Sequence, residues 1–153
     1  MKKVLIAIDY NPVSETVAEK GYELARTMNA EVCLIHILGD LGFYEAQYPS
    51  FLGYDGYTTA VGPNFDLALE MHNVAEDFLE KAARHLNDAE VKTKLVEGET
   101  AAALLDYAEE WNADLIVMGT HSHSVLEKLL IGTVAEKVLE KTKIPVFMVP
   151  VKK

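Results

Sequence analysis

Five short apolar runs occur along the chain, separated by longer segments with a helical pattern. The runs cover residues 4–8, 32–38, 91–96, 114–118 and 144–149. Their short length and the turn-forming residues around them predict β-strands. Residues 32–38 are almost wholly apolar, as expected of a strand covered on both faces. Polar and apolar residues nearly alternate in 91–96, which predicts an edge strand with one face in water.

Apolar residues recur at helical spacing between these runs. The first helical segment follows Asn11-Pro12, which predicts Asn11 as the N-cap and Pro12 as the first helical residue. The second covers residues 66–86, the third follows Gly98-Glu99-Thr100, and the fourth begins near Gly132. Residues 39–65 separate the second strand from the second helix and hold seven of the thirteen aromatic residues. We expect this aromatic segment to pack its rings over the end of the sheet and to shape the rim of a pocket.

The alternation of strands and helices predicts an α/β fold in one domain, residues 1–153. Right-handed crossovers make it a doubly wound parallel five-stranded sheet with helices on both faces. We expect the strand order 3-2-1-4-5, which sets strands 1 and 4 side by side where the order reverses. Ligands of such sheets bind beyond the carboxyl ends of the strands at that point.

Charge and cysteine content narrow the classes of partner. Twenty-four acidic residues against fourteen basic ones give a net charge of −10, and residues 66–110 carry −8 of it. Such a surface repels nucleic acids and anionic membranes, so we expect neither as a partner. The single Cys33 lies in an apolar run, which predicts a small buried side chain. The first apolar run is too short for a signal peptide, and we expect a cytoplasmic protein.

Two loops at the predicted switch point carry the candidate chemistry. Asp9 directly follows the first strand, and Gly119-Thr120-His121-Ser122 follows the fourth. Nine residues later, Gly132-Thr133 begins a helix. Free backbone N–H groups at such a turn and helix start bind anions, and glycine lets a phosphate approach closely. The sequence therefore predicts a phosphate-binding site.

With these features in this order, the chain resembles the universal stress protein family over almost its whole length. The resemblance is carried by Asp9, by the second strand with Leu34-Ile35-His36-Ile37, by the fourth strand ending in Met118-Gly119, and by a Gly-x2-Gly-x9-Gly-Ser/Thr signature. Ser122 stands where the signature has its second Gly, which departs from the pattern. If that position needs a positive φ, a side chain there costs roughly 1–2 kcal/mol, although a Ser hydroxyl can donate to phosphate.

The resemblance also implies roles for single residues. Asp9 would accept hydrogen bonds from ribose hydroxyls, and Ile37 would lie against adenine. The phosphates would be held by residues of the two glycine-containing loops: Gly119, His121, Ser122, Gly132, Thr133 and Val134. It further implies a homodimer, which we expect to pair through the fifth strand, Val146-Phe147-Met148-Val149.

Plainer roles compete at several of these positions. Asp9 is also a common turn residue, and Thr133 a common N-cap. His121 and His123 form a His-x-His pair with no third ligand in sight, so we predict no metal site there. His36 in an apolar run predicts a hydrogen-bonded core histidine. No nucleophile with a base and no Walker A loop occurs in the sequence, so we name no catalytic residue.

The resulting hypothesis is a cytoplasmic, homodimeric stress-response protein that binds ATP, with Mg²⁺, as a sensor or switch. Its action would depend on nucleotide-dependent conformation or on an unidentified protein partner, with at most slow hydrolysis or self-phosphorylation. Two alternatives stay open. One is a nucleotide-free homodimeric interaction module of the same fold, and the other is an enzyme of the adenine-nucleotide hydrolase type.

Overall fold

The computed structural model describes residues 1–39, 65–120 and 132–150. In the described residues, five β-strands alternate with four α-helices. In chain order they are β1 (Lys3–Ala7), α1 (Ser14–Thr27), β2 (Glu31–Leu38), α5 (Phe65–His85), β3 (Lys92–Glu97), α6 (Thr100–Glu110), β4 (Leu115–Gly119), α7 (Thr133–Lys141) and β5 (Val146–Val149). The predicted strands are all present, and their ends differ from the predicted ones by at most two residues.

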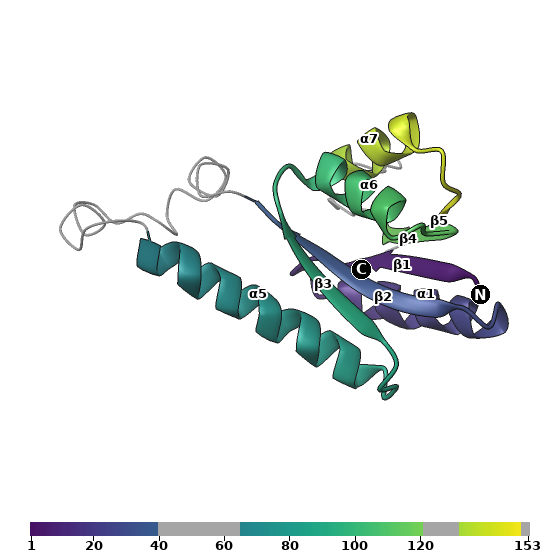
Figure 1. The fold of residues 1–153 in the computed structure, drawn as a ribbon, viewed down its shortest axis with the longest axis horizontal. Helices are drawn as coiled ribbons and strands as arrows, with labels where there is room; N and C mark the ends of the chain where they lie inside the picture. Colours follow the sequence, from purple (N-terminus) through teal and green to yellow (C-terminus); the bar gives the residue numbers. More distant parts are fainter. Residues whose placement is uncertain (40–64, 121–131, 151–153) are drawn as a thin grey trace.

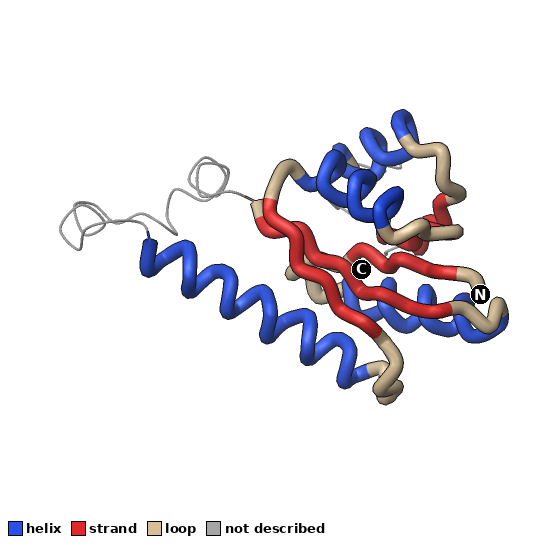
Figure 2. The backbone as a smooth tube through the Cα atoms, in the orientation of Figure 1, coloured by secondary structure: helices blue, strands red, loops and turns tan. Residues whose placement is uncertain are grey.

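The strands form one parallel sheet in the order β3-β2-β1-β4-β5, which confirms the predicted order and places β1 at the centre (Figure 2). Ile6 of β1 is level with Leu34 of β2 on one side and with Val117 of β4 on the other. β1 and β4 are therefore neighbours, and the loops that follow them leave the same edge of the sheet.

Helices cover both faces of the sheet, as predicted. In Figure 1, α6 and α7 lie on one side of the sheet and α1 and α5 on the other. Successive residues of a strand point to opposite faces. Val4 and Ile6 of β1 accordingly pack in the layer with α1 and α5, while Leu5 packs in the layer with α6 and α7. All three are fully buried, which agrees with the wholly apolar sequence of residues 4–8.

The start of α1 differs from the prediction. Asn11 is not the N-cap, because the helix begins at Ser14 with Val13 in the cap position. The Asn11 side chain instead accepts a hydrogen bond from the N–H of Val13 at 3.2 Å, and its backbone carbonyl accepts one from the N–H of Ser14 at 2.9 Å. An Asx turn thus uses the residues that we expected to open the helix.

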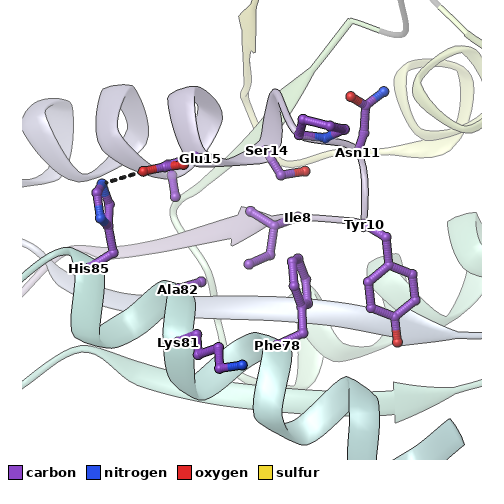
Figure 3. A pocket seen from close by; sticks show the side chains of 11 residues that line it. Ile8, Tyr10, Asn11, Ser14, Glu15, Phe78, Lys81, Ala82 and His85 are labelled. Atoms are coloured by element: carbon purple, nitrogen blue, oxygen red, sulfur yellow. Dashed lines mark ion pairs between the residues drawn. The ribbon is translucent and has the colours of Figure 1, made fainter.

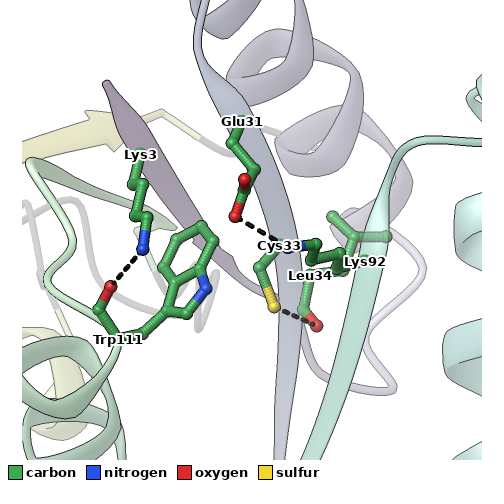
Figure 4. A network of polar contacts seen from close by, with 6 residues as sticks. All are labelled: Lys3, Glu31, Cys33, Leu34, Lys92 and Trp111. Atoms are coloured by element: carbon green, nitrogen blue, oxygen red, sulfur yellow. Dashed lines mark hydrogen bonds and ion pairs between the residues drawn. The ribbon is translucent and has the colours of Figure 1, made fainter. Parts of the chain in front are cut away.

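Polar contacts gather where several strands begin (Figure 4). The Lys3 ammonium donates to the backbone carbonyl of Trp111 at 3.1 Å and lies 5.2 Å from the centre of the indole ring. Lys92 pairs with Glu31 at 2.9 Å across the first residues of β3 and β2. Cys33 is 1% exposed, as predicted, and burial raises the pKa of its thiol to about 11. These contacts tie together the amino ends of the strands, which leaves the carboxyl ends as the candidate functional edge.

The two edge strands differ in exposure. β3 is mostly open to water, as its alternating sequence predicts. β5, at the other edge, exposes 41% of Phe147. Among the described residues, no helix combines the length and the apolar character that a membrane crossing requires.

Candidate functional site

The loop after β1 is held by hydrogen bonds around Asp9. Its Oδ1 accepts a hydrogen bond from the Ser14 hydroxyl and another from the N–H of Asn11, each at 2.9 Å. The N–H of Asp9 donates to Ser14 Oγ at 3.0 Å. Within the described residues, Oδ2 accepts no hydrogen bond. Asp9 therefore acts as a turn residue, the plainer of the two roles predicted for it. Its exposed carboxylate keeps a second oxygen for other donors.

The loop after β4 leaves the sheet next to the loop of Asp9. Gly119 is the last residue of β4 and is paired with Val149, and the N–H of Thr120 donates to the carbonyl of Val149 at 3.0 Å. The register between β1 and β4 pairs Ile6 with Val117, so the carboxyl ends of the two strands lie side by side. Asp9 and Gly119 thus lie at the carboxyl ends of adjacent strands, at one edge of the sheet.

The start of α7 has a backbone conformation that favours glycine. Gly132 holds the N-cap position at φ 89° and ψ 148°, where a side chain would be strained. Thr133 is the first helical residue, so the expectation that it forms the N-cap is wrong. The first intrahelical bond runs from the N–H of Glu136 to the carbonyl of Gly132 at 2.9 Å. The N–H groups of residues 133–135 have no acceptor in the described part of the chain, as is general at helix starts.

Ile37 and Val134 belong to the same hydrophobic layer, which lies between the sheet and helices α6 and α7. Ile37, next to the last residue of β2, is 9% exposed and belongs to the same buried cluster as Met118 of β4. Val134 of α7 packs against this cluster. Two of the predicted positions, at the end of β2 and the start of α7, thus line the same layer as the end of β4. His121 and Ser122 lie outside the described residues, as do residues 40–64 of the aromatic segment.

His36 is a core histidine, as predicted. It is 4% exposed, and its Nδ1 lies 2.9 Å from the carbonyl oxygen of Ile8. Its Nε2 has no hydrogen-bond partner among the described residues. Burial lowers the pKa of His36, although the bond to Ile8 acts in the opposite direction. The ring centre lies 4.7 Å from that of Tyr10 and 5.4 Å from that of Phe78, so three rings pack together.

The structure also has a cleft that was not predicted from the sequence. A cleft of about 310 Å³ lies between α1 and α5, on the face of the sheet opposite to α7 (Figure 3). Tyr10 and Phe78 form part of its wall, and Glu15 and His85 lie at one end. The Nε2 of His85 is 2.9 Å from Glu15 and 2.7 Å from Glu19, and these two carboxylates raise the pKa of the imidazole, Glu19 most. The i, i+4 spacing of the two glutamates is visible in the sequence, but their contact with a histidine 66 residues after Glu19 depends on the packing of the helices.

Comparison with known proteins identifies the fold and the family. The chain matches the model of the universal stress protein family over residues 1–150. It belongs to the universal stress protein family. Universal stress protein MJ0531 of Methanocaldococcus jannaschii is 31% identical over 151 residues, which cover 97% of this chain and 81% of that relative. Universal stress protein MJ0577 of the same organism is 28% identical over 153 residues, which cover 97% of this chain and 94% of the relative.

Solved structures of universal stress proteins have the same fold. The structure of MJ0577 matches with a TM-score of 0.74 at 24% identity, over 99% of this chain and 97% of that one. A universal stress protein from Archaeoglobus fulgidus in complex with dAMP matches with a TM-score of 0.66 at 22% identity, over 97% of each chain. The predicted α/β class and strand order of this universal stress protein are therefore confirmed.

Proposed function

We propose that this universal stress protein binds an adenine nucleotide, ATP together with Mg²⁺, at the carboxyl ends of β1 and β4. In this proposal it acts in the cytoplasm as a sensor or switch, through nucleotide-dependent conformation or choice of protein partner. The observation that carries the proposal is the start of α7, where Gly132 at φ 89° precedes three N–H groups without an acceptor in the described residues. The dAMP complex of the related protein from Archaeoglobus fulgidus supports an adenine nucleotide as the ligand class.

The phosphates would bind at the start of α7 and the end of β4. The N–H groups of Thr133 and Val134 would donate to phosphate oxygens, and the positive end of the helix dipole would favour their charge. Gly132 and Gly119 have no side chain to keep the phosphates away. His121 and Ser122, outside the described residues, would complete this side of the site.

The sugar and the base would lie nearer the centre of the sheet. Oδ2 of Asp9 would accept hydrogen bonds from ribose hydroxyls, since Oδ1 is engaged by Ser14 and Asn11. Ile37 would contact adenine near the end of β2, on the same side of the sheet as Val134. Asp9 would thus combine a structural role in its loop with a binding role.

Two measurements test nucleotide binding directly. The protein is purified and denatured, and released nucleotides are identified by chromatography. The emptied protein is then melted with increasing ATP. ATP at 100 times the dissociation constant should add about 2.7 kcal/mol to the free energy of unfolding. For a chain of this size that is a rise of roughly 5–10 °C in Tm.

One observation favours a second candidate, a nucleotide-free interaction module of the same fold. Ser122 replaces a glycine of the family signature. If no nucleotide is released and millimolar ATP leaves Tm unchanged, this module becomes the better account. Steady turnover of ATP with a second substrate would instead favour an enzyme of the adenine-nucleotide hydrolase type.

We further propose that the protein is a homodimer in which β5 of each subunit pairs with β5 of the other. β5 is an edge strand, and an apolar edge strand left bare invites pairing with another chain. A two-fold axis beside β5 would cover Phe147, which the single chain leaves 41% exposed.

A further inference from the structure

The end of the cleft between α1 and α5 brings three metal-ligating side chains together. Glu15 and Glu19 lie on successive turns of α1, and His85 is the last residue of α5. One oxygen from each carboxylate and one nitrogen of the imidazole lie within 4.8 Å of one another. The three groups thus converge on one point from two different helices.

The charge at this point is not balanced by other residues. Among the described residues, His85 is the only basic group within 4 Å of either glutamate. Lys81, which also lines the cleft, pairs instead with Asp77 of its own helix at 2.8 Å. Two carboxylates against one imidazole leave a net negative charge, which favours a dication.

The set of donor atoms indicates which dication fits. Imidazole nitrogen suits Zn²⁺, Co²⁺ and similar first-row ions, whereas Mg²⁺ and Ca²⁺ prefer oxygen ligands alone. Tetrahedral zinc, with bonds of about 2.0–2.2 Å, needs neighbouring ligand atoms about 3.4 Å apart. The contacts of His85 with Glu19 at 2.7 Å and with Glu15 at 2.9 Å must therefore lengthen by about 0.7 Å and about 0.5 Å. All three side chains are exposed, so small rotations suffice.

The cleft supplies free space beside the three ligands. Three protein ligands leave the fourth position of a tetrahedral ion open. Glu15 and His85 belong both to the ligand set and to the lining of the 310 Å³ cleft, so the open position has free space beside it (Figure 3). The rest of the cleft is lined largely by apolar side chains, among them Ile8, Ala18 and Phe78.

We propose that Glu15, Glu19 and His85 bind a divalent first-row transition-metal ion, with Zn²⁺ or Co²⁺ as probes, at the mouth of the α1–α5 cleft. This site lies on the face of the sheet opposite to α7 and is separate from the proposed nucleotide site. An ion here would join the start of α1 to the end of α5 and would present its open position to the cleft.

The test is a metal titration of the full chain, free of any histidine tag and stripped of metal by a chelator. Co²⁺ is added without nucleotide, and its visible absorption is followed; Zn²⁺ is then titrated in competition with a chromogenic chelator. We expect one equivalent of metal to bind. His85→Gln and Glu19→Gln should each weaken binding at least about tenfold, a lower limit taken from changes around known sites.

Two control variants locate the site. His72 lies 3.8 Å from Glu76 of its own helix, but the described residues offer no third ligand there, so His72→Gln should leave binding unchanged. The double variant His121→Gln/His123→Gln should also retain the full equivalent. Metal-dependent melting gives a second readout, because a merely structural role of His85 would lower Tm without removing the rise that Zn²⁺ produces in the parent protein.

The proposal is overturned if the parent protein binds no stoichiometric Co²⁺ or Zn²⁺ at micromolar concentrations. It is equally overturned if binding survives both His85→Gln and Glu19→Gln, or if it is lost in the His121/His123 double variant. Since no nucleotide is added, these outcomes are independent of whether ATP binds at the other face.

Discussion

His36 makes the stability of the protein depend on pH. Burial lowers its pKa in the folded chain below the ordinary value near 6.5 that it regains on unfolding. Well above pH 6.5, His36 is neutral in both states, and its full contribution to the free energy of unfolding is present. As pH falls below 6.5, the unfolded chain binds a proton first, and the free energy of unfolding decreases. The decrease has a limit of about 1.4 kcal/mol per pH unit.

Urea unfolding between pH 5.5 and 8 measures this effect. The variant His36→Asn keeps a donor near the carbonyl of Ile8 but cannot titrate. The parent protein should lose up to about 1 kcal/mol relative to this variant between pH 6.5 and 5.5. His85, whose pKa is raised, contributes in the opposite direction, but it is present in both proteins and cancels. A pH-independent difference, or the same trend in the control His72→Asn, would show that His36 is not responsible.

Asp9 allows the structural and binding roles of one side chain to be separated. In Asp9→Asn the remaining oxygen still accepts from Asn11 and Ser14, so Tm should change little. The second carboxylate oxygen, proposed to bind ribose, is lost, and the dissociation constant of ATP should rise about tenfold, which equals 1.4 kcal/mol. Calorimetric titration and melting give the two readouts. The control Asp77→Asn removes one negative charge on the opposite face and should alter neither; equal affinity in the Asp9 variant would refute the ribose contact.

At the scale of elements, α1 approaches the sheet closely at Gly21. A Cβ at this position would lie 2.8 Å from Cδ1 of Ile6 and 3.0 Å from Cγ1 of Val117, both fully buried. Overpacking costs about 1–3 kcal/mol, and the better helix propensity of alanine returns only about 0.5–1 kcal/mol.

Gly21→Ala should therefore lower the free energy of unfolding by about 1 kcal/mol, measured by urea denaturation. Glu23→Ala, on the exposed side of the same helix, serves as the control and should stay within about 0.5 kcal/mol of the parent protein. A Gly21→Ala protein as stable as this control would mean that α1 and the sheet can move apart without cost.

Helices and strands whose apolar residues recur with a clear period were predictable from the sequence, whereas local turns and the packing of the helices were not. The apolar face of α5 placed that helix within one residue of its observed bounds, Phe65–His85. The start of α1 was missed because the side chain of Asn11 bonds to the N–H of Val13 in a turn instead of capping the helix. An Asx turn and a helix N-cap use the same residue types, and only the backbone conformation distinguishes the two.

The candidate site was predictable to the same degree. The strand order follows from the alternation of elements, and it brings Asp9 and Gly119 to adjacent strand ends. The sequence predicts a glycine-containing helix start at Gly132, and the positive φ of this residue explains why a glycine is needed there. The α1–α5 cleft and the meeting of Glu15 with His85 could not be predicted, because they depend on how two helices distant in sequence pack on one face.

At the scale of the whole molecule, the proposed dimer predicts that a charge placed in β5 lowers the mass of the protein in solution from that of a dimer to that of a monomer. Phe147→Lys would place two charges beside the two-fold axis and should convert the dimer to monomer, measured by light scattering after size exclusion. Val74→Lys replaces a similarly exposed apolar residue on α5, remote from β5, and should leave the mass unchanged. A parent protein that is monomeric at all concentrations, or a Phe147→Lys protein that remains dimeric, would contradict pairing through β5.

Nucleotide binding at the start of α7 is tested most directly by one calorimetric titration with ATP and Mg²⁺. The emptied parent protein should bind ATP, and Gly132→Ala should bind at least tenfold more weakly, because a side chain at φ 89° costs about 1–3 kcal/mol or displaces the helix start. Gly21→Ala, which overpacks α1 against the sheet on the face opposite to α7, serves as the control and should keep the affinity of the parent protein. Equal affinity in all three proteins, or no binding by the parent at millimolar ATP, would contradict the account.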